Sequence, residues 1–156
     1  MAEFHGVKSR WEIKYEWSGG IAISRFMQGL KEGKILGVKC PHCKRVLVPP
    51  RIFCERCFIE LTEWVELSPR GKINTFSIAY IDTNALPIST PQINAVIDLD
   101  DARGIIGIFH IIGEAKPEEI YVGMPVEAVF RPAEERTGSI LDIKYFRPLK
   151  EGKPNE

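Results

Sequence analysis

Two C-x-x-C pairs constrain this 156-residue sequence more than any other feature: Cys40 and Cys43 form the first pair, and Cys54 and Cys57 form the second. The chain has no other cysteine. A C-x-x-C step lets two thiolates reach one ion from a single tight turn, and two such turns supply the four sulfurs of a tetrahedral structural zinc site. The spacing therefore predicts a zinc ribbon whose metal stabilises the fold and, with no open coordination position, does no chemistry.

Three other chemistries use cysteines in such patterns. Structural disulfides need an oxidising compartment, and the N-terminus lacks a signal-peptide pattern. A redox C-x-x-C usually occurs once and not as a matched pair. Iron in a rubredoxin-like site uses the same four thiolates, so the sequence leaves iron open, although zinc is the commoner occupant.

His42 lies inside the first turn, and we interpret it as a solvated turn residue because four sulfurs already complete the tetrahedron.

The composition is that of a globular chain with an uneven distribution of charge. No run of about 18 apolar residues occurs, so we expect no membrane span and a cytoplasmic protein. Residues 25–72 hold ten Lys or Arg against five Asp or Glu, whereas residues 73–156 hold eight against thirteen. We therefore expect a basic ribbon segment followed by an acidic segment.

Residues 1–33 are predicted to form an N-terminal arm and a short helix. Four aromatic or aliphatic residues alternate with other residues, as in an extended arm with one apolar face: Trp11, Ile13, Tyr15 and Trp17. This arm either docks to a partner or packs on the chain's own core, and the pattern favours neither. Four further residues have helical spacing before a stop at Gly33: Ile23, Phe26, Met27 and Leu30.

The rest of the chain reads as mainly β. Residues 34–69 are expected to be the ribbon, with strands at 34–39 and 45–48 and with a stretch at 60–67 that supplies core residues. After the turn signal at 68–71, alternation predicts five strands, at 73–81, 92–99, 105–112, 126–131 and 140–147. A helix start is predicted at Lys116–Ile120, between the third and fourth of these strands. Five strands in this arrangement predict an OB-fold barrel over residues 70–150, and the polar residues 151–156 are expected to be disordered.

Four short segments together carry a family resemblance: 30–37 (LKEGKILG), 48–51 (VPPR), 63–66 (EWVE) and 122–126 (VGMPV). They resemble the zinc-ribbon and OB-fold family of acyl-CoA-associated proteins known as DUF35. That resemblance implies a non-catalytic scaffold subunit that associates with thiolase-fold enzymes, including acetoacetyl-CoA thiolase and hydroxymethylglutaryl-CoA synthase of isoprenoid synthesis, and with some hydratases and aldolases acting on acyl-CoA. It also implies that all four cysteines bind zinc, and it supplies no catalytic residue.

The resemblance has one departure, and it leaves the acyl-CoA site to be located. Many ribbons place glycine after each C-x-x-C, where this chain has Lys44 and Phe58, so the geometry of both turns is in doubt. Basic residues of the ribbon are candidates for the phosphates of CoA, and each is also an ordinary member of a solvated charged face: Lys39, Lys44, Arg45 and Arg51. Trp64, or a concave apolar face of the barrel, is a candidate shelter for the acyl chain or pantetheine.

Two other functions are weaker on the sequence. Single-stranded nucleic acid needs cations and stacking rings along the barrel, but the barrel segment is acidic and its second and third predicted strands contain only Phe109 as an aromatic residue. An enzyme needs a reactive set, and His110 lies among isoleucines as a packed strand residue would. The aspartates at 98, 100 and 101 are ordinary turn chemistry.

Overall fold

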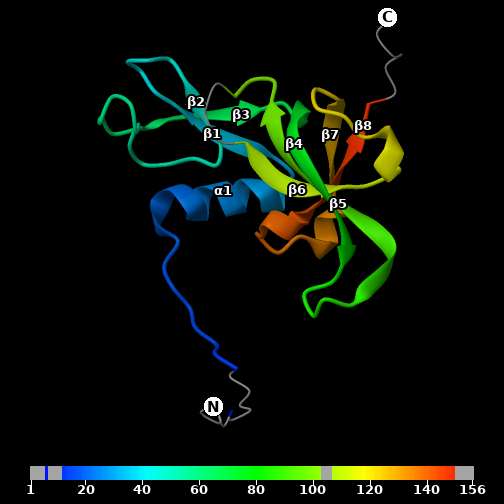
Figure 1. The fold of residues 1–156 in the computed structure, drawn as a ribbon. Helices are drawn as coiled ribbons and strands as arrows, with labels where there is room; N and C mark the ends of the chain where they lie inside the picture. Colours follow the sequence, from blue (N-terminus) through cyan, green and yellow to red (C-terminus); the bar gives the residue numbers. More distant parts are fainter. Residues whose placement is uncertain (1–5, 7–11, 103–106, 150–156) are drawn as a thin grey trace, which may run out of the picture.

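The computed structural model describes residue 6, residues 12–102 and residues 107–149. These form one α-helix, three short 3-10 helices, a three-stranded sheet and a closed five-stranded barrel (Figure 1). The predicted disordered tail, Trp11 and the first residues of the strand expected at 105–112 lie outside the described residues.

Helix α1 (Gly20–Glu32) begins three residues before the predicted apolar positions and ends as predicted. Its C-cap, Gly33, has φ of 80°, a left-handed conformation that glycine adopts without steric cost. The Gly33 N–H donates to the Leu30 carbonyl at 2.9 Å, and the Lys34 N–H donates to the Gly29 carbonyl at 2.8 Å, so the last turn is closed. The buried face of the helix includes Phe26 and Leu30.

The ribbon strands form a sheet in the order β2-β1-β3, antiparallel throughout: β1 (Ile35–Lys39), β2 (Val46–Leu47) and β3 (Glu63–Leu67). The second strand is shorter than the expected 45–48, because Val48 lies next to two prolines that cannot donate to a ladder. The third strand takes up Glu63–Leu67 of the stretch at 60–67, and Glu60 makes only an isolated bridge with Phe53.

The barrel closes in the order β4-β5-β6-β8-β7, with β6 and β8 parallel and its other neighbours antiparallel. Its strands have these bounds: β4 (Arg70–Ile81), β5 (Pro87–Leu99), β6 (Ile108–Ile112), β7 (Pro125–Phe130) and β8 (Ile143–Pro148). This is the OB-fold order, so the predicted fold class is confirmed. Gly71 lies so close to β5 that an added Cβ would be 2.3 Å from the Asp98 carbonyl oxygen.

Two predicted strand boundaries of the barrel are wrong, and one predicted helix is of another type. The second strand begins at Pro87, five residues before the expected start, because the β4–β5 hairpin continues to a turn at Asp82–Leu86. The first part of the segment expected at 140–147 is instead a 3-10 helix, Ile140–Asp142. The expected helix start at Lys116–Ile120 yields only a 3-10 helix, Pro117–Glu119.

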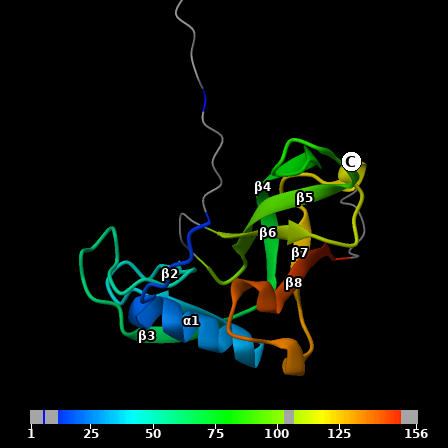
Figure 2. The same ribbon diagram turned by 90° about the horizontal axis from the view of Figure 1, so that it is seen from below.

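Ribbon, helix and barrel share one hydrophobic core. The main buried cluster joins Phe26 and Leu30 of α1, Ile35 and Leu67 of the ribbon strands, and barrel residues such as Phe146. The segment between β7 and β8 lies beside the C-terminal part of α1 (Figures 1 and 2), where a Cβ added to Gly33 would meet the Arg136 guanidinium. The ribbon is therefore fixed against the barrel by apolar packing as well as by the chain.

A buried carboxylate organises the segment between β7 and β8. Asp142 is only 2% exposed, and it accepts the backbone N–H groups of Thr137, Gly138 and Ser139 at 3.0, 2.7 and 3.1 Å. Burial raises the pKa of Asp142, but these three donors more than offset that effect and hold it below the ordinary value. The ionised carboxylate is therefore the form that stabilises this segment.

We expect Asp142→Ala to lower the free energy of unfolding by roughly 1.5–3 kcal/mol at neutral pH, because three partly buried backbone amides lose a charged acceptor. The carboxylate's contribution is present above the carboxyl's ordinary pKa and is lost as the pH falls through the lowered folded-state pKa. Urea unfolding at neutral and acidic pH measures both effects. Leu141→Ala, at an exposed neighbour, is the control. Equal stability of Asp142→Ala and wild type at neutral pH would contradict this role.

Candidate metal centre

The two cysteine pairs lie on matching turns. In the first, the Lys44 N–H donates to the Cys40 carbonyl at 2.9 Å, and in the second the Phe58 N–H donates to the Cys54 carbonyl at 2.8 Å. The first turn connects β1 to β2, and the second lies between β2 and β3. Both project from the sheet on the side away from the barrel (Figure 1). The fold thus brings together two pairs that are ten residues apart in sequence.

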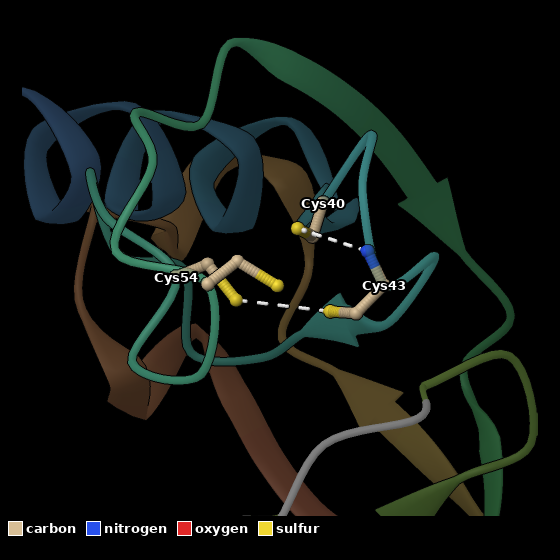
Figure 3. A group of neighbouring side chains, drawn as sticks. Cys40, Cys43 and Cys54 are labelled. Carbon is tan, nitrogen blue, oxygen red and sulfur yellow. Dashed lines mark hydrogen bonds between the residues drawn. The ribbon is translucent and has the colours of Figure 1, made fainter.

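The four sulfurs converge on one point. All four Sγ atoms lie within 4.8 Å of one another, and Figure 3 shows the sulfurs of Cys43 and Cys54 pointing toward each other at 3.7 Å. A tetrahedral ion with sulfur ligands at about 2.3 Å requires sulfurs about 3.8 Å apart. Cys40 and Cys54 are buried, whereas Cys43 and Cys57 are half-buried. The donor set therefore fits one zinc ion, which Cys40, Cys43, Cys54 and Cys57 would hold.

The turns reach this geometry without the glycines that many ribbons have. Lys44 has φ of 61° and Phe58 has φ of 54°, both in the left-handed region. Side chains other than those of glycine, asparagine and aspartate rarely adopt this conformation, which costs roughly 1–3 kcal/mol per residue. The doubt that the sequence raised about turn geometry is resolved, because both residues take the conformation that glycine would take.

Neighbouring groups prepare part of the site for a cation. The backbone N–H of Arg45 is the main reason why the pKa of Cys43 falls to about 6, which favours a thiolate at neutral pH. Desolvation raises the pKa of Cys57 to about 12, with the other three thiols adding to the effect. Four adjacent thiols thus do not all ionise by themselves, and a dication supplies the charge that lets them all bind as thiolates.

Sequence reasoning missed a role for His42. Its side chain is exposed, as predicted, yet its Nδ1 atom lies 3.3 Å from the Sγ atom of Cys57. A protonated Nδ1 would donate to that sulfur as an outer contact of the metal site. The position of His42 between Cys40 and Cys43 is the sequence feature that could have predicted this contact.

The candidate CoA-binding residues do not form one site. Lys39 pairs with Glu63 at 3.1 Å, and Arg45 pairs with Glu55 at 2.8 Å. Lys44 and Arg51 are exposed and form no ion pair among the described residues. Trp64 is half-buried, and the Arg25 guanidinium lies 4.5 Å from the centre of its ring, so α1 covers one face.

A shallow groove of about 320 Å³ lies on the barrel, lined by β5, β6 and the segment entering β8. Its apolar lining includes Phe109, Ile111 and Leu141, and Arg131 and Lys144 add positive charge. This is the face on which OB-folds commonly bind ligands.

The histidine and aspartates weighed as catalytic residues make structural contacts. His110 is 7% exposed, and its Nε2 atom lies 3.3 Å from the Ile140 carbonyl oxygen. Burial is the main reason why its pKa is lowered. Asp98 accepts from the Asn74 amide at 2.7 Å, and Asp101 accepts from the Ser68 N–H at 2.8 Å.

The N-terminal arm is exposed over its described residues. Ile13, Tyr15 and Trp17 face solvent, and the rings of Tyr15 and Trp17 stack with centroids 5.3 Å apart. The arm extends away from the helix and both sheets (Figures 1 and 2). Of the two interpretations, packing on the chain's own core does not hold for these three residues.

Among the described residues, no helix has the length and apolar character to span a bilayer.

A four-cysteine ribbon joined to a five-stranded barrel defines the class: a rubredoxin-like zinc ribbon fused to an OB-fold. Two family models match in this order, the ChsH2 rubredoxin-like zinc ribbon domain over residues 27–62 and the ChsH2 C-terminal OB-fold domain over residues 64–131.

The chain belongs to the DUF35 family. It is 35% identical over 119 residues to a DUF35 domain-containing scaffold protein of Methanocaldococcus jannaschii, covering 74% of this chain and 82% of the relative. A scaffold protein with the same description from Pyrococcus furiosus is 28% identical, with 81% of this chain and 93% of the relative covered.

Two solved structures have similar folds. A DUF35 family protein of unknown function from Sulfolobus solfataricus has a TM-score of 0.61 and 29% identity, covering 74% of this chain and 81% of that one. A chain of the Ltp2-ChsH2(DUF35) aldolase has a TM-score of 0.58 and 20% identity, covering 80% and 91% respectively. At that identity the second likeness concerns the fold alone.

We expect Cys54→Ser to lose most of the bound zinc and to unfold the ribbon, because structural zinc sites gain about 10–16 kcal/mol from the metal. Elemental analysis measures the zinc per chain, and thermal unfolding measures stability. His42→Gln is the matched control and should keep one zinc, since four sulfurs suffice. One full equivalent of zinc and an unchanged melting temperature in Cys54→Ser would show that the site is not structural.

Proposed function

We propose that this chain is a non-catalytic scaffold subunit that associates with a thiolase-class enzyme and helps it to handle acyl-CoA. The observation that carries the proposal is the 35% identity, over most of both chains, to a relative described as a scaffold protein. The chain's own residues support a non-catalytic role. Its four cysteines are gathered at one structural metal site, and the ring of the buried His110 lies within hydrogen-bond distance of a backbone carbonyl.

The proposed partners are acetoacetyl-CoA thiolase and hydroxymethylglutaryl-CoA synthase, which would place the chain in acyl-CoA or isoprenoid metabolism. This choice rests on the family resemblance of the segments at 30–37, 48–51, 63–66 and 122–126. The Ltp2-ChsH2(DUF35) aldolase, whose chain has a similar fold, supports the general idea of an enzyme bound to a DUF35 subunit. The exposed rings of Tyr15 and Trp17 offer anchors of the kind that protein interfaces use.

Acyl-CoA would meet this chain through its exposed cations and its barrel groove. Lys44 and Arg51 are the candidates for phosphate contacts, since Lys39 and Arg45 already neutralise carboxylates. The groove beside Phe109 has a volume at the lower end of the range for small-molecule sites, which suits a short acyl chain or the pantetheine arm.

Size-exclusion chromatography tests the association. The chain mixed with purified acetoacetyl-CoA thiolase and hydroxymethylglutaryl-CoA synthase of its source organism should elute in one earlier peak at micromolar concentrations. The chain by itself should show no thiolase or hydrolase activity on acetoacetyl-CoA. Separate elution of all three proteins, or turnover of the thioester by the chain alone, would refute the proposed function.

The acyl-CoA contact is tested by charge reversal. Lys44→Glu combined with Arg51→Glu should raise the dissociation constant of the assembled complex for acetoacetyl-CoA by about tenfold, because two favourable phosphate contacts become repulsive. Lys72→Glu, an exposed barrel residue, is the control. Isothermal titration measures the constants, and equal values for the double variant and the control would remove Lys44 and Arg51 from the site.

A further inference from the structure

The second cysteine turn carries an unusual apolar tip. Phe58 is 84% exposed and has φ of 54°, although it is a bulky aromatic residue. In this conformation glycine has no steric cost, whereas a side chain with a Cβ is strained. The exposed ring gains almost nothing from burial that would offset the strain. The fold would therefore be at least as stable with glycine here, so stability does not account for the phenylalanine.

Two more apolar side chains are exposed on the same hairpin. Ile52 is 47% exposed and Phe53 is 53% exposed. The hairpin is closed by the Leu61 N–H, which donates to the Ile52 carbonyl at 2.8 Å, and by the bridge between Phe53 and Glu60. The metal site fixes the backbone between them. This tip therefore presents exposed apolar groups on a rigid support, as an interface anchor does.

The exposed charge around the tip is mainly positive. Lys44, Arg51 and Arg56 are exposed and form no ion pair among the described residues. Glu60 is the one exposed carboxylate of the hairpin outside such a pair, since Glu55 is bound to Arg45. The thiolates that a zinc ion would neutralise in part lie at the centre of the two turns. A partner protein that matches this surface would thus have a pocket with apolar residues at its base and acidic residues around its edge.

We propose that the second cysteine hairpin is a docking knob for an apolar, acid-rimmed pocket of the partner enzyme. The ring of Phe58 at its turn inserts into that pocket, and the exposed side chains of Ile52 and Phe53 nearer its base add apolar contact. This inference rests on the proposed function and adds to it the surface through which the chain is held. Strain at Phe58 is retained because the ring is buried only in the complex. Arg56 and its neighbours steer the encounter, which makes association sensitive to salt.

The test measures binding of the purified chain and its variants to purified acetoacetyl-CoA thiolase of the source organism by biolayer interferometry. Phe58→Gly should keep its zinc and melt at or above the wild-type temperature, yet its dissociation constant should rise at least about tenfold. Phe58→Asn, which tolerates the left-handed conformation, should weaken binding in the same way. Arg56→Glu should slow association and reduce its dependence on salt.

Two controls separate the knob from general effects. Ala85→Gly relieves a φ of 60° in the β4–β5 turn, and Tyr80→Ser removes an exposed ring from β4, so both should bind as wild type does. If wild type binds the thiolase and Phe58→Gly binds equally well, the knob is refuted and the proposed function stands. If wild type does not bind the thiolase, the same comparison is made with hydroxymethylglutaryl-CoA synthase, and if it binds neither enzyme, both the knob and the proposed function are refuted. Loss of stability in Phe58→Gly would also overturn the inference, because it would give Phe58 a structural role.

Discussion

The attraction of one cation to four thiolates is the interaction on which the ribbon depends. The ribbon's own buried cluster contains only five residues, and two of them are metal ligands: Val38, Cys40, Leu47, Cys54 and Leu61. Three apolar side chains bury too little surface to order two turns and a two-residue strand. Metal–sulfur bonds therefore take the place that a larger core would occupy, and the ribbon's folding free energy is in large part binding free energy.

The same bonds explain how the turns tolerate side chains in a glycine conformation. At Lys44 and Phe58 the local backbone preference opposes the fold. Each turn is fixed from two sides, by an N–H bond to the carbonyl of its first cysteine and by two sulfurs that would bind the shared ion. Strain persists only where the surroundings determine the conformation more than once, and these turns meet that condition. A ribbon held by apolar packing alone would not have this tolerance.

Much of the fold and the metal site could be predicted because both depend on short-range patterns. The C-x-x-C spacing located the ligands, and alternation of apolar residues located the barrel strands. These patterns do not show which side chains face each other on neighbouring strands. Lys39 is opposite Glu63 in the register of β1 and β3, and the two form an ion pair. The positive charge of Lys39, which the sequence suggested for binding a CoA phosphate, is therefore neutralised within the sheet. The sequence pattern predicts that β5 starts at residue 92 and not at Pro87, because proline is common in turns; in the structure Pro87 is the first residue of the strand, where a missing N–H costs little.

The shared core has a consequence for protein engineering. In sequence, the boundary between the two sheets lies between Leu67 and Arg70, where β3 ends and β4 begins. A chimera that joined this ribbon to a foreign barrel at that point would leave Phe26 and Leu30 of α1 facing a surface that did not evolve to receive them. A chimera that keeps this core must therefore transfer the helix together with the barrel surface that it covers. These two parts are separate in the sequence, and no linker marks where the chain should be joined.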